Sequence, residues 1–242
     1  MHLRIHESPE AASQAAATQL TTWLTHPQTK QVMVAGGNTP LDLYARVAAA
    51  HLALRHLHIF MLDEYVGVPP EHPRNCANLL YHSVVEAWRI PSSHYHRIRP
   101  EPEAALPSAL EHQRKIEAGG GLDVLILGLG QNGHLGFNEP GSRADSTARL
   151  VPLEHVSIEA NRRWFEGQYA PDAGITVGLK TLLAARHILV LAFGPHKARA
   201  VAAMVEQAPS DACPASFLQR HPDAWIHLDG AAAEGLTRVS TK

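Results

Sequence analysis

Three polar side chains lie close together in residues 132–142 (NGHLGFNEPGS), directly after the apolar run 124–128. They are the amide of Asn132, the imidazole of His134 and the carboxylate of Glu139. An imidazole can take up and release a proton near neutral pH, and a neighbouring carboxylate or amide can hold its ring in one orientation. A histidine bonded only to backbone would have no chemical role, but the other two groups favour proton transfer.

A second candidate group is Asp63, which follows the apolar run 57–62 without a break and is paired with Glu64. An isolated acid at the end of a strand can be no more than a helix cap. Two adjacent acids next to a ligand-binding loop also suit a catalytic base, and the two interpretations are evenly balanced from this segment alone.

Residues 36–40 (GGNTP) have the composition of a phosphate-binding loop. Gly36 and Gly37 allow the backbone to approach a ligand, and Asn38 tolerates a positive φ. Thr39 and Pro40 are expected to cap and begin a helix. A glycine-rich turn needed only for close packing is the alternative.

Lys197 follows the apolar run 187–193 and falls in the first turn of a predicted helix. The helix dipole disfavours a cation there unless an anion is bound as well. Lys197 is therefore a candidate for a second phosphate contact, against the alternative of a solvated lysine.

The elements that must position these groups alternate along the chain. Apolar runs without polar alternation predict strands that are covered on both faces, as in a parallel sheet. They occupy residues 31–35, 57–62, 122–127, 175–177, 187–193 and 225–228. Helical stretches are expected from Ser8 to about residue 24 and over residues 41–50, 77–88, 108–118 and 196–207. The order predicts an α/β fold: a three-layer, doubly wound, Rossmann-like sheet with helices on both faces.

A single domain over residues 1–242 is expected, with residues 100–107 (PEPEAALP) as the nearest approach to a linker. In open parallel sheets, ligands bind beyond the carboxyl ends of the strands, because the loops there converge. Since the candidate groups follow three or four different strands, the sequence predicts that they meet in one crevice.

Composition excludes several classes of partner. With 21 basic against 23 acidic residues, the net charge is -2, so we expect neither nucleic acid nor membrane as a partner. Cys76 and Cys213 are too few for a disulfide framework. The 17 histidines are scattered, and even His94 and His96 lack the spacing of a metal site, so no metal is expected. The absence of a signal peptide predicts a cytoplasmic protein.

Taken together, these segments resemble the glucosamine-6-phosphate deaminase family, which shares a superfamily with 6-phosphogluconolactonase. The resemblance runs over nearly the whole chain and is most specific in residues 61–67, 132–142 and 214–222. It implies conversion of a small-molecule sugar phosphate, glucosamine 6-phosphate, into fructose 6-phosphate and ammonia, without a cofactor.

The resemblance also implies roles for single residues. Asp63 matches the base of the enolisation step, and His134, with Glu139 and Asn132, matches the group that opens the sugar ring. Arg163 matches a phosphate ligand, which would join Lys197 and the loop from Gly36 to Thr39. Without the resemblance, Arg163 would be assigned to a solvated helix.

Some features depart from the deaminase pattern. Some deaminases carry Asp where this chain has Asn132, and residues 36–40 are closer to lactonases. Lactonases, however, have no glutamate at the place of Glu139, and ester hydrolysis needs one base where deamination needs two proton-transfer groups. A short C-terminal end and a reduced basic set at residues 146–149 predict no activator site and a monomer or small homo-oligomer.

Three alternatives remain: a 6-phosphogluconolactonase, a deaminase or isomerase for a sugar such as galactosamine 6-phosphate, and a sugar-phosphate sensor without turnover. The sensor is disfavoured because no room for a helix-turn-helix is expected before residue 8. The preferred C4 epimer, and whether residues 145–168 close over the substrate, are not determined by the sequence.

Overall fold

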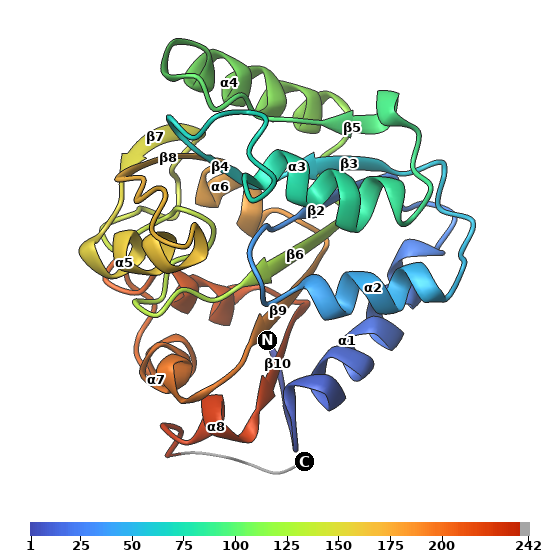
Figure 1. Cartoon of the computed structure of the whole chain (residues 1–242). Helices are drawn as coiled ribbons and strands as arrows, with labels where there is room; N and C mark the ends of the chain where they lie inside the picture. Colours follow the sequence, from blue (N-terminus) through green and yellow to red (C-terminus); the bar gives the residue numbers. More distant parts are fainter. Residues whose placement is uncertain (238–242) are drawn as a thin grey trace.

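The computed structural model describes residues 1–237 and contains a seven-stranded parallel sheet in the order β1-β10-β9-β6-β2-β3-β5 (Figure 1). Its strands are β1 (His2–His6), β10 (Ala224–Asp229), β9 (His187–Ala192), β6 (Val124–Gly128), β2 (Gln31–Val34), β3 (His58–Met61) and β5 (Tyr95–His96). The predicted α/β fold is confirmed. All four residues of β2 are buried, as expected for a strand with both faces covered.

A second, three-stranded antiparallel sheet lies beside the first. It consists of β4 (Asp63–Tyr65), β8 (Ala173–Thr176) and β7 (Arg149–Pro152), in the order β4-β8-β7. The prediction that residues 175–177 belong to the parallel sheet is therefore wrong. Burial of Ile175 and Val177 explains their apolar character, but an apolar run does not determine which sheet a strand joins.

Helices cover both faces of the parallel sheet, with α1 and α2 on one side and α6 and α7 on the other (Figure 1). The α-helices are α1 (Pro9–Leu24), α2 (Leu41–Ala49), α3 (Cys76–Leu80), α4 (Pro102–Ala118), α5 (His155–Trp164), α6 (Leu179–Leu183), α7 (Ala198–Glu206) and α8 (Gly230–Ala233). Other helical segments are η1 (Tyr81–Glu86, π), η2 (Ser92–His94), η3 (Pro195–Lys197) and η4 (Pro214–Arg220). Across residues 1–237, none of the helices combines the length and apolar character that a membrane span requires.

Three local expectations are corrected. Residues 100–107 are not a linker, because α4 begins at Pro102 and buries Ala105 on the same face as Ala109. The stretch 77–88 is a short α-helix continued by a π-helical turn. Thr39 makes no capping hydrogen bond, since α2 has Pro40 at its N-cap position.

The edge strand β1 was not predicted from the sequence. Its residues are all exposed or half-buried, because within residues 1–237 β1 pairs with β10 alone. The pattern therefore lacks the continuous apolar character of the central strands. A single domain remains a prediction.

Strand order explains where the candidate groups meet. Strands β9, β6, β2 and β3 are adjacent and parallel, so their carboxyl ends lie at one edge of the sheet. The segments that begin at Gly36, Asp63, Leu129 and Phe193 follow these strands. The fold thereby brings them together, as the sequence predicts for an open parallel sheet.

Candidate active site

A cavity of about 310 Å³ lies at this edge of the sheet, between the strand ends and α5. Six of the predicted site residues line it: Gly36, Gly37, Asn38, Asp63, His134 and Lys197. Asp63 and His134 therefore face the same space, although 71 positions separate them in the chain (134 − 63 = 71). Asn132 and Glu139 do not line the cavity, but Glu139 is bonded to His134, which does, and Asn132 is bonded to Glu139.

The imidazole of His134 is held by a carboxylate. Its Nδ1 lies 3.2 Å from Oε2 of Glu139, and Asn132 Nδ2 donates to the same oxygen at 2.6 Å. The backbone N–H of His134 in turn donates to Asn132 Oδ1 at 3.3 Å. With Nδ1–H directed at the carboxylate, Nε2 is left as the basic nitrogen. This arrangement keeps one tautomer in place for proton transfer.

Glu139 is the buried centre of this group. Burial acts to raise the pKa of Glu139, but the hydrogen bond and charge of His134, followed by hydrogen bonds from Ser157 and Asn132, bring the pKa below its ordinary value. The side chain is therefore a carboxylate at neutral pH and can stabilise a positively charged imidazole beside it.

The ring of His134 packs directly on the backbone of Gly130. A Cβ placed on Gly130 would lie 2.3 Å from His134 Cδ2 and 2.4 Å from its Nε2. Any side chain at position 130 would therefore push the imidazole out of place. Glycine at the end of β6 is required by this close approach.

Asp63 is the first residue of β4, at the point where the chain leaves the parallel sheet. Its side chain is almost fully buried, and Cys76 Sγ lies 3.9 Å from Oδ1. Burial, together with the charge of Glu64, raises the pKa of Asp63 to about 7, against a smaller opposing effect of the Cys76 thiol. A carboxylate with such a pKa is a stronger base than an exposed aspartate.

The neighbouring acid, Glu64, is engaged in hydrogen bonds to the backbone. Its carboxylate accepts backbone N–H groups of Tyr65, Cys76 and Ala77 at 2.8, 3.0 and 2.8 Å. Burial raises the pKa of Glu64 and these three donors oppose the rise. Glu64 thus anchors the start of α3 behind Asp63, and the two acids of the sequence motif have separate tasks.

Lys197 lines the same cavity and is bonded to the segment that follows β6. Its Nζ donates to the carbonyl of Leu129 at 2.5 Å, and burial lowers the pKa of Lys197 to about 8. A carbonyl offers only partial negative charge to the ammonium. The site is thus electrostatically prepared for an anion.

The remaining phosphate candidates differ in exposure. Asn38 is exposed and lines the cavity, whereas Thr39 is half-buried beside Gly128, where a Cβ would lie 4.0 Å from that of Thr39. Arg163 is exposed on α5, and its Nε donates to the carbonyl of Glu159 at 3.2 Å. Neither Thr39 nor Arg163 lines the cavity, although the charge of Arg163 contributes, after burial and Lys197, to lowering the pKa of His196 on the cavity wall.

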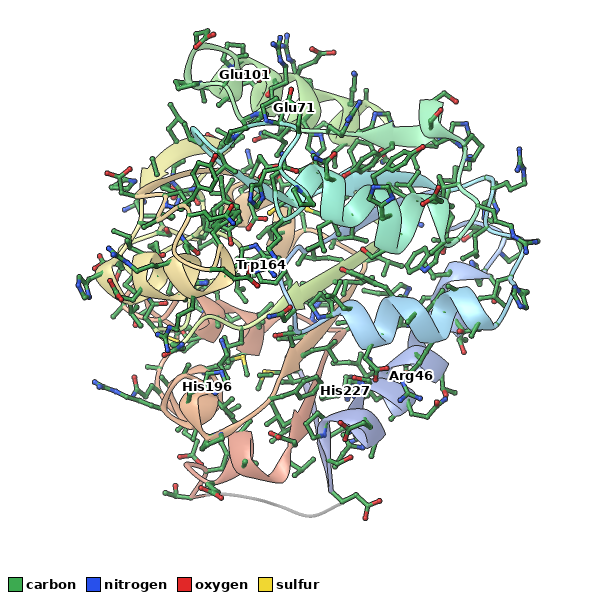
Figure 2. All side chains as sticks on the ribbon, in the orientation of Figure 1. Arg46, Glu71, Glu101, Trp164, His196 and His227 are labelled. Carbon is green, nitrogen blue, oxygen red and sulfur yellow. The ribbon has the colours of Figure 1, made fainter. Side chains whose placement is uncertain are left out.

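Helix α5 supplies residues that the sequence did not indicate. Ser157 donates to Glu139 Oε1 at 2.5 Å, and Trp164 lines the cavity with its Nε1 bonded to the carbonyl of Arg74 at 2.9 Å. Figure 2 shows Trp164 between α5 and the end of β6. The guanidinium of Arg74 lies 5.5 Å from the centre of the indole and also bonds to Glu166. The alternation of polar residues in α5 resembles a solvated helix, so sequence gave no signal for these contacts.

Within residues 1–237, no three histidine, cysteine, aspartate or glutamate side chains are arranged to hold a metal ion. The side chains that line the cavity include two groups able to transfer protons, His134 and Asp63, and the cation of Lys197.

The sequence is similar to those of known proteins. A sequence model of the family described as glucosamine-6-phosphate isomerases/6-phosphogluconolactonase matches residues 6–226. The glucosamine-6-phosphate deaminase of Shewanella loihica is 40% identical over 208 residues, which are 84% of this chain and 78% of the relative. That of Corynebacterium urealyticum is 37% identical over 243 residues, or 98% of this chain and 93% of the relative.

Solved structures give the same result for the fold. A monomeric glucosamine-6-phosphate deaminase has a TM-score of 0.92 at 27% identity, with 97% of this chain and 100% of the other covered. The 6-phosphogluconolactonase from Trypanosoma cruzi has a TM-score of 0.80 at 22% identity, with 98% and 97% covered, and shares the fold.

Proposed function

The chain belongs to the glucosamine-6-phosphate isomerase and 6-phosphogluconolactonase family, and on this premise we propose that it converts glucosamine 6-phosphate and water into fructose 6-phosphate and ammonia. The observation that carries the proposal is the presence of two separate proton-transfer groups, Asp63 and His134, on one cavity. A lactonase needs one water-activating base, whereas isomerisation with deamination needs two groups that act on different atoms.

The first step opens the sugar ring. His134 Nε2 takes the proton of the C1 hydroxyl and delivers it to the ring oxygen, so that the C1–O5 bond breaks and the C1 aldehyde forms. Glu139 stabilises the imidazolium that exists between the two transfers, because its carboxylate lies 3.2 Å from Nδ1. Asn132 and Ser157 hold Glu139 in position from two sides.

The second step moves a proton between carbons. Ionised Asp63 takes the C2 hydrogen as a proton while O1 of the aldehyde gains a proton, giving an enolamine. Asp63 then returns its proton to C1 while the nitrogen loses one, giving an imine at C2 and a hydroxyl at C1. Its raised pKa of about 7 brings the carboxyl group closer in basicity to the carbon acid. Water then adds to C2, the C2–N bond breaks, and ammonia leaves as the ketone forms. The reaction is hydrolytic, since water supplies the ketone oxygen.

The phosphate group fixes the substrate between these two groups. Lys197 supplies a half-buried cation, the loop from Gly36 to Thr39 supplies backbone N–H groups, and Arg163 adds charge from α5. Because the phosphate is held away from the reacting atoms, its binding energy serves to hold C1 and C2 in position next to His134 and Asp63. The assembly we propose is a monomer or small homo-oligomer, supported by the match to a monomeric deaminase. A cytoplasmic location remains a prediction from sequence.

The test is the release of ammonia from a panel of sugar phosphates. We expect ammonia from glucosamine 6-phosphate, with galactosamine 6-phosphate tested beside it for the C4 epimer, and no hydrolysis of 6-phosphogluconolactone. The His134→Gln variant should slow the reaction of the cyclic sugar by about a hundredfold or more. Lactone hydrolysis without ammonia release would replace the proposal with the lactonase alternative.

A further inference from the structure

His196 lies on the wall of the cavity next to Lys197, although nothing in the sequence motifs assigns it a role. It is the middle residue of η3, which follows β9, and it is exposed beside α7 (Figure 2). Gly194, with φ 84°, directs the chain into this turn. The backbone N–H of Gly194 donates to both carboxylate oxygens of Asp229, at 3.0 and 3.1 Å.

The imidazole of His196 is folded back over this glycine. A Cβ at Gly194 would lie 3.0 Å from both Nδ1 and Cε1 of His196. Within residues 1–237, neither ring nitrogen of His196 makes a hydrogen bond, unlike the ammonium of Lys197, which is bonded to Leu129. The ring is thus held by packing while its polar atoms stay available to a ligand.

The charges that face His196 come from three elements. Lys197 is on the same turn, Arg163 approaches from α5, and Asp229 lies at the end of β10. Two cations, Lys197 and Arg163, therefore disfavour protonation of the imidazole, and the carboxylate of Asp229, which is bonded to Gly194, opposes them. An imidazole between two cations is an unfavourable place for a further positive charge unless an anion is bound.

We propose that His196 is a further contact of the substrate phosphate, and that the imidazole of His196 takes up a proton when the phosphate binds. This inference rests on the proposed function, because it places the phosphate of the substrate at Lys197. Burial and then Lys197 lower the pKa of His196, with Arg163 acting in the same direction and Asp229 opposing. A bound phosphate dianion reverses the local field, so the ring becomes a charged hydrogen-bond donor in the complex.

The sign of the pH dependence follows from this shift. Binding raises the pKa of His196, so its contribution to affinity is present at low pH and is lost as the pH rises through the pKa of the complex. The phosphate ester itself loses its second proton near pH 6. The contribution should therefore be clearest from about pH 6 to about pH 8.

The experiment measures KM, kcat and proton uptake for the full chain and three variants. His196→Gln keeps a polar group but cannot be charged, and His196→Lys is charged at every pH in the range. His56→Gln is the matched control, because His56 is exposed on the segment before β3, away from the cavity. Calorimetric titration with inorganic phosphate, in buffers of different ionisation enthalpy, gives the number of protons taken up.

We expect His196→Gln to raise KM by about threefold to tenfold near pH 6.5, with a smaller effect on kcat. The difference in KM between the variant and the unchanged protein should become smaller toward pH 8. Its proton uptake on binding phosphate should be smaller than that of the unchanged protein. Because the ionisation of phosphate contributes equally to both proteins, it cancels when the two values are subtracted. His196→Lys should restore a low KM that no longer varies in this way. His56→Gln should match the unchanged protein throughout.

Equal KM and equal proton uptake in His196→Gln and the unchanged protein would overturn the inference, even if ammonia release confirms the deaminase. If no ammonia is released but proton uptake still depends on His196, the proposed reaction fails and the phosphate contact stands. If His196→Gln does not fold, His196→Lys serves as the test. The inference is overturned if the KM of His196→Lys varies with pH in the same way as the KM of the unchanged protein.

Discussion

Ser157 donates a hydrogen bond of 2.5 Å to Oε1 of Glu139, so α5 is bonded to the carboxylate that orients His134. The helix that forms one wall of the cavity and the loop to which we assign ring opening are therefore one hydrogen-bonded unit. Any displacement of α5 removes a donor from Glu139, whose pKa is kept low in part by Ser157.

Replacing Ser157 by Ala should lower kcat about tenfold or more for the cyclic sugar, because a hydrogen bond to a charged group contributes about 1.5–3 kcal/mol. The loss raises the pKa of Glu139, so the acid limb of the kcat profile should move to higher pH. Ser83→Ala is the control, since Ser83 Oγ bonds only to the carbonyl of Leu79. An unchanged pH profile would show that Ser157 is structural.

Replacing Asp63 by Asn should abolish exchange of the C2 hydrogen with solvent while substrate still binds. The amide keeps the shape of the side chain but cannot accept a proton from carbon. Exchange is followed by deuterium incorporation from heavy water, and binding by calorimetry. Exchange that persists at the original rate would remove Asp63 from the role of base. Asp172→Asn, on an exposed side chain, should exchange normally.

Asp63 should also set a pH dependence of stability. Its pKa in the folded protein, about 7, lies above the ordinary value of 3.8. A raised acid pKa makes ionisation costly in the folded state, so the cost is full above pH 7 and disappears as the pH falls from 7 toward 4. Asp63→Asn should therefore raise Tm at about pH 8, by roughly 2–4 °C for each 1 kcal/mol gained in the free energy of unfolding. Near pH 4 the Tm of the variant and of the unchanged protein should be equal. Calorimetric melts across this range would show it, and a Tm difference independent of pH would contradict it.

Replacing Lys197 by Met should raise KM about tenfold or more, with a smaller fall in kcat, because the buried aliphatic stem is kept and only the charge is lost. Lys180→Met, at an exposed position of α6, is the matched control. Arg163→Ala should give a smaller rise, since its guanidinium is exposed. Unaltered KM in Lys197→Met would place the phosphate elsewhere.

Much of this site is predictable because a parallel sheet gathers strand ends at one edge. Asp63 and the segment from Asn132 to Glu139 follow apolar runs in the sequence, and both lie at that edge in the structure. The apolar runs can be recognised in the sequence because both faces of a central strand are buried. Asn132 with Glu139 was indicated by spacing alone, and the hydrogen bonds bear out that proximity.

The rest depends on tertiary contacts that leave no local pattern. The short strand β8 has the same apolar character as a central strand, yet it pairs with β4 and β7. Ser157 and Trp164 lie on a helix rich in polar residues, and only its position against the cavity gives them partners. His196 has no motif around it that marks a ligand contact. Its place follows from the turn at Gly194 and the approach of α5.

The small sheet has a consequence for how the protein fails on heating. The outer strand of that sheet, β7, packs on a minor cluster of Phe137, Val151 and Leu153, separate from the main core, whereas Ile175 of the central strand β8 belongs to the main core. Phe137 of the minor cluster also lines the cavity. Regions with few buried apolar contacts open at lower free energy than the core. Loss of turnover on warming should thus precede the cooperative melting of the parallel sheet, and it should reverse on cooling as β7 pairs again with β8. Thermal inactivation of this molecule is then a local fraying event, with most of its secondary structure still intact.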